Sequence, residues 1–271
     1  MGSELLGLNH VLADRQHWHL PVKIDVVSLF PEFVKQVLEQ GMPRVARETG
    51  ALTVQCRNPR DHADNRYRSV DDRPYGGGPG MVMQAEPLAR CIEAARAAQG
   101  QTLVLAMSPQ GQPLNQALVE QLAQQPALVL VCGRYEGLDE RLLDGCIDLE
   151  VSLGDFVLSG GELAAMVLID AIARLLPGVL GAQDSAQNDS FSQGLLDHPH
   201  YSRPEQWRGQ AVPDVLLSGD HARIKRWREK QALGQTWLKR PGLLDKLELN
   251  VEQTALLQEF IGDRQSKGKQ S

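Results

Sequence analysis

Three short stretches rich in glycine and small polar residues each lie at the end of an apolar run, a pattern typical of ligand-binding loops. They span residues 107–111, 133–137 and 152–161. In open α/β sheets, ligands bind outside the carboxyl ends of the strands, where glycine lets the backbone approach them closely. Any one stretch alone could be an ordinary turn. Together they predict one pocket that holds a small molecule largely through backbone atoms.

This pocket lacks the signatures of common nucleotide and metal sites. The chain has no G-x-G-x-x-G motif after a strand and no G-x-x-x-x-G-K-[ST] motif, so a dinucleotide site and a P-loop are disfavoured. Its four cysteines are widely spaced without a C-x-x-C pair, which argues against a zinc site or a disulfide framework. We therefore expect no metal ligands in the site, and a reducing, cytoplasmic environment.

Three charged residues have a ready structural interpretation. Arg174 follows Asp170 by four residues, a spacing that favours a helical salt bridge. Asp189 lies in a polar segment, where composition alone makes it a turn residue. Glu162 stands three residues after Ser159, which predicts a capping box and a structural role for its side chain.

The elements that must position these residues alternate along the first two thirds of the chain. Apolar runs predict strands at 23–29, 52–56, 103–107, 127–132 and 147–151. Helical periodicity predicts helices at 31–41, 86–98, 114–124 and 162–176, and residues 57–81 read as one long loop. Strands separated by helices predict an α/β fold, with a mostly parallel sheet and helices on both faces.

Composition divides the chain further. We expect an N-terminal extension at 1–21, a cofactor-binding domain at 22–180, a polar linker at 181–193 and a small helical domain at 194–271. That last domain should hold helices at 220–233 and 251–264, with a frayed end at 265–271. No apolar run reaches the roughly 18 residues that a membrane helix needs.

Charge is distributed unevenly between these parts. The net charge of −6 combines −10 over residues 1–200 with +4 over residues 201–271. A basic second part can bind phosphates even though the whole chain is acidic. Residues 221–230 gather five Lys and Arg around Trp227, and form either a solvated helix face or an RNA-phosphate surface.

The sequences of these stretches resemble motifs of the bacterial tRNA (guanine-N1)-methyltransferases of the SPOUT class. Residues 133–141 read GRYEGLDER against GRYEGIDER in that family, and 152–162 read SLGDFVLSGGE against SIGDYVLSGGE. Residues 71–81, DDRPYGGGPGM, and 189–197, DSFSQGLLD, are similar to two further family motifs. The resemblance covers roughly residues 22–262.

The resemblance implies that the three loops form a deep C-terminal trefoil knot and bind S-adenosylmethionine, with Mg²⁺ an additional candidate cofactor. The implied cofactor-binding residues are Ser108, Pro109, Gly111, Gly133, Tyr135, Glu136, Gly137, Ser152, Leu153, Gly154, Asp155, Phe156, Val157, Leu158, Gly160 and Gly161. The implied tRNA-binding residues are Gly78, Gly80, Asp197, Arg223 and Arg226.

The family's general base and catalytic arginine fall at Asp189 and Arg174. A carboxylate can take the proton from N1 of guanine, and a guanidinium can stabilise the negative charge that develops on O6. The implied activity is methylation of guanine 37 of tRNA at N1, by a homodimer with composite active sites. The alternatives are a non-catalytic RNA-binding protein, disfavoured by these two residues, and a SPOUT ribose 2′-O-methyltransferase, disfavoured by the 57–81 loop and Asp189.

Overall fold

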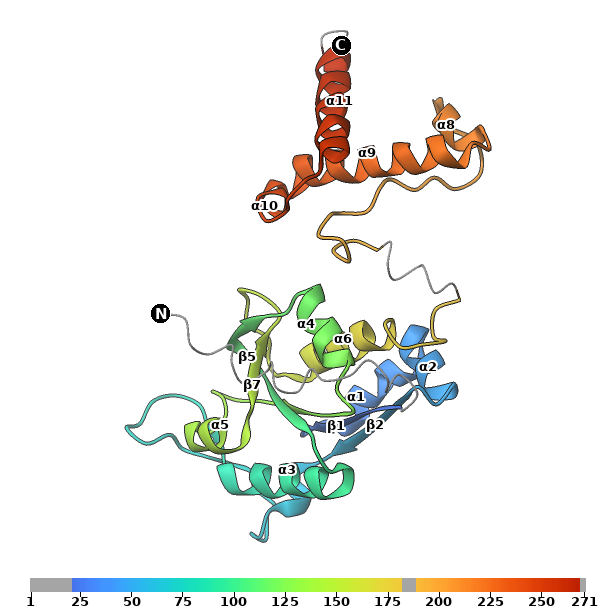
Figure 1. The fold of residues 1–271 in the computed structure, drawn as a ribbon. Helices are drawn as coiled ribbons and strands as arrows, with labels where there is room; N and C mark the ends of the chain where they lie inside the picture. The colour runs from blue at the N-terminus through green and yellow to red at the C-terminus, as the bar shows by residue number, and fades with distance from the viewer. Residues whose placement is uncertain (1–20, 182–188, 269–271) are drawn as a thin grey trace. The chain divides into compact units, whose positions relative to one another are not determined.

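The computed structural model describes residues 21–181 and 189–268, which belong to two compact units (Figure 1). The first unit ends at Gln183 and the second begins at Asp184, within the predicted linker. The predicted extension at 1–21 lies outside the described residues, except for Pro21. The roles assigned to the domains stay predictions.

The first unit is built on a five-stranded parallel sheet in the order β2-β1-β6-β5-β7 (Figure 1). Every residue of the central strand β6 is buried, as expected for an apolar run covered on both faces. The prediction of a mixed α/β fold with a parallel sheet is confirmed. The strands are β1 (Val22–Val27), β2 (Leu52–Arg57), β5 (Leu103–Pro113), β6 (Ala127–Cys132) and β7 (Leu149–Ser152).

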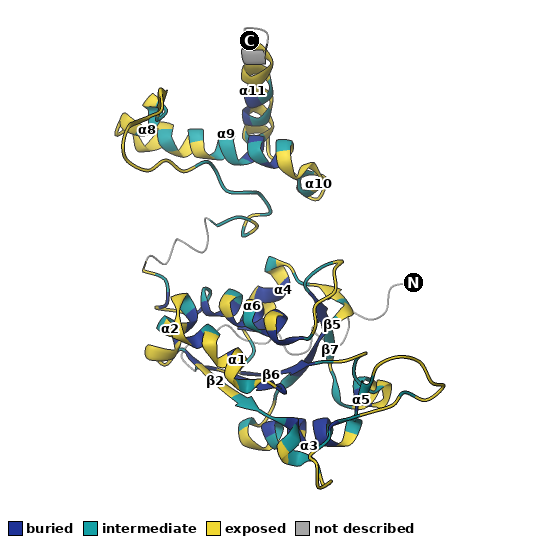
Figure 2. Cartoon of the chain, turned by 180° about the vertical axis from the view of Figure 1, so that it is seen from behind, coloured by how far each residue is buried: buried dark blue, intermediate teal, exposed yellow. Residues whose placement is uncertain are grey.

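Helices cover both faces of this sheet, and buried residues gather between them and the strands (Figure 2). One face carries α1 (Pro31–Lys35), α2 (Gly41–Glu48), α4 (Gln116–Ala123) and α6 (Glu162–Ala173). The other carries α3 (Ala85–Gln99) and α5 (Glu140–Cys146). Along β6, Leu128 and Leu130 face the first core while Val129 and Val131 face the second, because strand side chains alternate.

Two local predictions in this unit are wrong. The helix expected at 31–41 is interrupted: α1 gives way to a 3₁₀ turn at Gln36–Glu39, and α2 begins at Gly41, where φ is +60°. A glycine that can end one helix is here the first residue of the next. The expected loop at 57–81 also contains structure, namely a 3₁₀ turn at Pro59–His62 and β3 (Asp71–Asp72), which pairs with β4 (Val82–Met83).

The second unit is mainly helical. Its described elements are a hairpin of β8 (Gln206–Trp207) and β9 (Gln210–Ala211), then α8 (Asp214–Leu217), α9 (His221–Lys239), α10 (Pro241–Leu244) and α11 (Val251–Gly268). The helix expected at 220–233 is longer than predicted. The fraying expected at 265–271 is wrong for residues 265–268, which belong to α11, and residues 269–271 lie outside the described residues. None of the described helices is long and apolar enough to cross a membrane.

Close packing of α9 on α11 stabilises this unit. Leu233, Leu256 and Phe260 are buried. A Cβ at Gly234 would lie 2.3 Å from the Phe260 ring, so only glycine lets the ring sit against the α9 backbone. Asn250 and Gln253 cap α11 reciprocally, each side chain accepting a hydrogen bond from the other's backbone N–H.

Candidate active site

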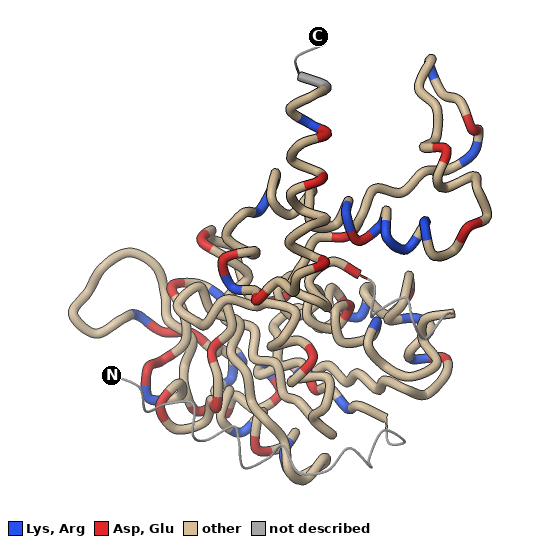
Figure 3. The backbone as a smooth tube through the Cα atoms, turned by 45° about the horizontal axis from the view of Figure 1, so that its top comes forward, with Lys and Arg blue, Asp and Glu red and all other residues tan. Residues whose placement is uncertain are grey.

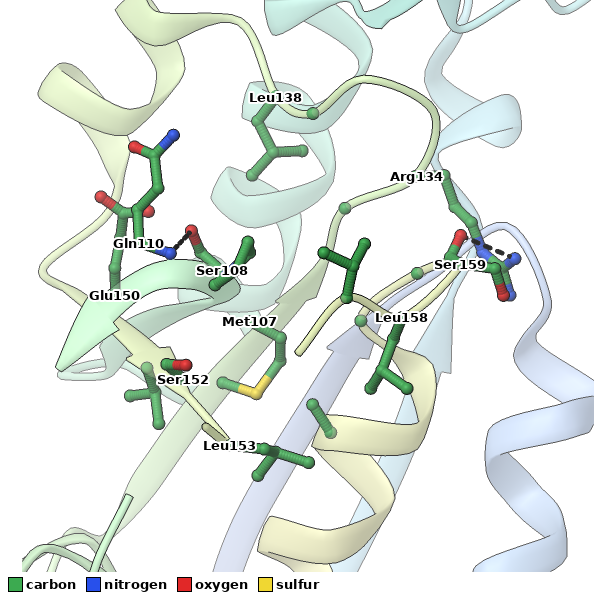
Figure 4. A pocket seen from close by; sticks show the side chains of 18 of the residues that line it. Met107, Ser108, Gln110, Arg134, Leu138, Glu150, Ser152, Leu153, Leu158 and Ser159 are labelled. Carbon is green, nitrogen blue, oxygen red and sulfur yellow. Dashed lines mark hydrogen bonds between the residues drawn. The ribbon is translucent and has the colours of Figure 1, made fainter. Parts of the chain in front are cut away.

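The first glycine-rich stretch lies at an irregularity within β5, and the other two follow β6 and β7. Together they line a cavity of about 350 Å³ (Figure 4). This volume falls within the range of small-molecule sites. Side chains of Met107, Ser152, Leu153 and Leu158 surround the cavity, giving it a partly apolar wall. The topology therefore assembles the pocket that the sequence predicts.

Most of the expected cofactor-binding residues line this cavity. They are Ser108, Pro109, Gly133, Tyr135, Glu136, Gly137, Ser152, Leu153, Gly154, Phe156, Val157, Leu158, Gly160 and Gly161. Gly111 and Asp155 are not among the described residues that line it. Four lining residues lie within the three predicted stretches but were not among the expected cofactor-binding residues, namely Met107, Gln110, Arg134 and Ser159. The lining residues outside those stretches are Leu138, Glu140, Leu143, Glu150, Val151 and Ala164. Leu138 and Glu140 lie inside the recognised motif at 133–141, whereas Leu143 lies further along α5, a helix that periodicity did not reveal.

Gly111 has a structural role that explains its place outside the lining. The pairing of β5 with β7 shifts register between Met107 and Gln112, so residues 108–111 bulge out of the strand. A Cβ at Gly111 would lie 2.3 Å from the backbone nitrogen of Val151. Glycine is therefore needed for the two strands to pair beyond the bulge.

Gly161 brings two of the loops into direct contact. Its N–H donates a 2.9 Å hydrogen bond to the carbonyl oxygen of Gly133. A Cβ at Gly161 would lie 2.8 Å from Cα of Cys132, a distance that packed side chains do not adopt. The glycine thus lets the loops pack on each other, which is a different reason from the close ligand contact expected at the sequence level.

Arg134 and Glu162 form an ion pair at the rim of the pocket. An Arg134 nitrogen, Nη2, lies 2.9 Å from Glu162 Oε2, and the Glu162 side chain is only 1% exposed. Ser28 donates a 2.8 Å hydrogen bond to Glu162 Oε1, while Arg134 Nη1 donates to the carbonyl oxygen of Ser159 (Figure 4). The predicted capping box is therefore wrong: the N-cap of α6 is Gly161, and the Glu162 side chain ties α6 to β1 and to the 133–137 loop.

One carboxylate oxygen of a residue in the pocket wall has no hydrogen-bond partner. Among the described residues, Glu150 Oε2 is buried and accepts no hydrogen bond, although Glu150 lines the cavity. A buried carboxylate oxygen is costly unless a donor or a positive charge meets it. The arrangement suits a ligand that carries a cationic group.

Cys132 ends the β6 strand below the pocket and is fully buried. Burial raises the pKa of its thiol well above the ordinary value. The thiol therefore stays protonated at neutral pH and is a packing group rather than a nucleophile.

The residues that follow the glycine loop at 76–80 are hydrogen-bonded to the 133–137 loop of the pocket. Glu136 N–H donates a 2.9 Å hydrogen bond to the Met81 carbonyl oxygen, and Met83 N–H donates to that of Gly137. Gly78 and Gly80 have φ values of +122° and +85°, which other residues rarely adopt. A Cβ at Gly80 would also collide with the Glu136 side chain. Backbone hydrogen bonds thus connect the end of the expected substrate loop to the expected cofactor loop.

The two candidate catalytic residues belong to different units. Arg174 is the C-cap residue of α6 in the first unit, and its N–H donates to the carbonyl oxygen of Asp170 at 3.2 Å. Asp189 lies in the second unit, where its carbonyl oxygen accepts a 2.6 Å hydrogen bond from Ser192 Oγ. The turn of residues 189–195 is held on α9, because Leu196 N–H donates to Thr236 Oγ1.

The expected tRNA-binding residues of the second unit differ in how they are engaged. Basic residues lie along α9 (Figure 3), where Arg223 is exposed while Arg226 forms a 2.8 Å ion pair with Glu259. Arg226, followed by Lys230, lowers the pKa of Glu259 to about 2. Asp197 binds His200 Nε2 at 2.8 Å. Both arginines are thus exposed to solvent, but Arg226 already has a carboxylate partner.

Comparison with known proteins identifies the family. The family model described as tRNA (Guanine-1)-methyltransferase TrmD matches residues 22–246. The tRNA (guanine-N(1)-)-methyltransferase of Serratia proteamaculans is 56% identical over 245 residues, covering 90% of this chain and 96% of that protein. The protein of the same name from Alcanivorax borkumensis is 55% identical over 249 residues, covering 90% and 94%. The chain therefore belongs to the TrmD family of tRNA (guanine-1)-methyltransferases.

Proposed function

We propose that the protein transfers a methyl group from S-adenosylmethionine to N1 of guanine at position 37 of tRNA, beside the anticodon. Relatives with 54–56% identity bear the name tRNA (guanine-N(1)-)-methyltransferase, which supports the reaction. The observation that carries the proposal is the cavity formed jointly by the three glycine-rich stretches.

The cavity fits the proposed methyl donor in charge as well as size. S-adenosylmethionine carries a positive sulfonium and a positive ammonium group, and the unpaired Glu150 Oε2 offers a negative group in the wall. The backbone of residues 153–158, together with Gly133, would hold adenine and ribose. When bound, the cofactor supplies a methyl group on a sulfonium that departs as a neutral thioether.

The protein's own contribution is proton removal and charge stabilisation. N1 of guanine keeps its proton at neutral pH and is a poor nucleophile until that proton is removed. Asp189 would accept this proton, a step worth about 10²–10⁴ in rate. Arg174 would stabilise the negative charge that develops on O6 of the base. The 76–80 loop would close over the guanine and exclude water.

We further propose a homodimer in which each active site combines the first unit of one subunit with the second unit of its partner. The position of Asp189 beyond the end of the first unit supports this arrangement, since a two-fold interface repeats any shared site twice. We also propose that the first unit contains a trefoil knot and that the second unit binds tRNA. We further propose that the protein is cytoplasmic and that Mg²⁺ has a role in the reaction.

The reaction is tested by nucleoside analysis of a tRNA bearing guanine 37, after incubation with the protein and S-adenosylmethionine. We expect 1-methylguanosine, and none from the same tRNA with adenine at position 37. Formation of a 2′-O-methylated nucleoside would instead favour the ribose methyltransferase. Tight tRNA binding without any methyl transfer would favour the non-catalytic RNA-binding protein.

Sharing of active sites is tested with mixed dimers of two inactive chains, one carrying Gly161→Val and the other Asp189→Ala. A shared site predicts that each mixed dimer contains one intact site and recovers part of the activity. If verified mixed dimers remain inactive, each site lies within a single chain.

A further inference from the structure

The second unit contains a cluster of side chains that could bind a metal ion, of which only Asp197 is among the expected tRNA-binding residues. Asp197, His198 and His200 each offer one ligand atom, and these atoms all lie within 4.8 Å of one another. His200 Nε2 lies 2.8 Å from Asp197 Oδ2, and His198 Nε2 lies 3.7 Å from Asp197 Oδ1. We propose that these three side chains bind a divalent transition-metal ion of the zinc type.

The spacing of the ligand atoms suits such an ion. Zinc–nitrogen and zinc–oxygen bonds of about 2.0–2.2 Å place neighbouring ligand atoms of a tetrahedral site about 3.3 Å apart. The two histidine–carboxylate separations lie on either side of that value. Small side-chain movements would bring all three atoms to bonding distance, with the metal replacing the hydrogen bond between Asp197 and His200.

The neighbouring groups prepare His198 for this role. Its Nδ1 lies 3.1 Å from the Pro199 carbonyl oxygen, which can only accept, so Nδ1 carries the proton and Nε2 keeps its lone pair. A second hydrogen bond of this kind orients most metal-bound histidines. The ring also packs edge-on against Trp227, at 6.2 Å between centroids. In this tautomer the nitrogen able to bind a metal is Nε2, the atom that lies 3.7 Å from Asp197 Oδ1.

The ligand types select the class of metal. Imidazole nitrogen suits zinc, nickel and copper, whereas magnesium prefers oxygen ligands and retains its water. Three protein ligands leave further positions for water, and His200 is 70% exposed, so the ion can enter from solvent. This site is thus distinct in chemistry from any Mg²⁺ that the methyl transfer uses.

A bound metal would stabilise the turn that carries Asp189. Asp197 N–H donates a 2.9 Å hydrogen bond to Ser190 Oγ, and Phe191 N–H donates to the Leu195 carbonyl oxygen at 2.7 Å. Fixing the Asp197 side chain therefore restrains both ends of the turn of residues 189–195. The metal would therefore restrain the turn next to the proposed base. This effect does not depend on Asp189 being the base.

The test is titration of metal-free full-length protein with Co²⁺, followed by competition with Zn²⁺. The sequence also contains His17 and His19, so every variant carries His17→Gln and His19→Gln to remove that second histidine pair. We expect one Co²⁺ per chain, visible absorption typical of nitrogen and oxygen ligands without thiolate, and displacement by equimolar Zn²⁺ but not by millimolar Mg²⁺.

Variants of the ligands and matched surface histidines decide the assignment. His198→Gln and His200→Gln should each weaken Co²⁺ binding at least tenfold, while His62→Gln and His221→Gln should leave it unchanged. Far-UV circular dichroism of each variant verifies that the helices are intact. Hydrogen exchange of residues 189–197 should slow with metal bound. Absence of stoichiometric binding, or equal binding by the double His198→Gln, His200→Gln variant, would overturn the proposal.

Discussion

The pocket of the first unit and the basic surface of the second unit are organised by different physical means. In the pocket, backbone segments touch directly at Gly111 and Gly161, and the Glu162 charge is buried and paired with Arg134. On α9 most cations are exposed although Lys230 is buried, and Arg226 and Lys230 share Glu259. Adding one atom to a close-packed site should change its ligand affinity strongly. Replacing one charge on a solvated surface should change affinity only slightly, and that change should depend on salt concentration.

The largest expected effect is a loss of methyl transfer at Asp189 without a loss of cofactor binding. Asp189→Asn keeps the size of the side chain but removes the base, so methyl transfer should fall by about 10²-fold or more. Binding of S-adenosylhomocysteine, measured by calorimetry, should stay within twofold, because the pocket lies in the other unit. Wild-type turnover in single-turnover assays would show that Asp189 is not the base.

A single added methyl group should disrupt the close-packed region next. Gly161→Ala places a Cβ 2.8 Å from Cα of Cys132, so the loops must separate and cofactor affinity should drop at least tenfold. Gly145→Ala is the matched control, because no atom lies within 4 Å of its Cβ and the position is helical. Equal affinities of the two variants would mean that the loop contact does not shape the pocket.

The solvated region should respond through salt dependence. Replacing Arg223, Arg226 and Arg228 by Gln should weaken tRNA binding and reduce the slope of log affinity against log salt by about one per lost phosphate contact. Arg226 is already paired with Glu259, so Arg226→Gln alone should change the slope least. Filter binding at several salt concentrations measures this, with Arg44→Gln on the first unit as control. An unchanged slope in the triple variant would indicate that these arginines of α9 form a solvated face and do not contact phosphates.

The smallest expected effect concerns acid stability of the second unit. Arg226 and Lys230 lower the pKa of Glu259 from 4.5 to about 2, so the folded state binds this proton less readily than the unfolded chain. The resulting stabilisation is present above pH 4.5 and is lost as pH falls toward 2. Since Glu259 is 41% exposed, we expect about 1 kcal/mol or less.

Urea unfolding of the full chain at pH 7 and pH 3 measures this contribution. Glu259→Gln should destabilise the protein at pH 7 and reduce the difference in unfolding free energy between the two pH values. An unchanged pH dependence would mean that the ion pairs on α9 add nothing to stability.

Local patterns in the sequence were sufficient for much of the architecture. The continuous apolar run at 127–132 predicts a strand buried on both faces, and β6 occupies that range at the centre of the sheet. The three glycine-rich stretches predict one pocket, and most of their residues line it. These predictions hold because strand periodicity, burial on both faces and glycine at strand ends are properties of neighbouring residues.

Tertiary packing alone decided the contacts between distant segments. Ser28 and Glu162 are 134 residues apart, and their hydrogen bond replaces the capping box that the local spacing favours. Gly111 must be small because the backbone of Val151 lies against it, and Gly161 because the backbone of Cys132 does. Local spacing cannot reveal such constraints, since the atom that excludes a side chain belongs to a segment brought close only when the sheet has formed.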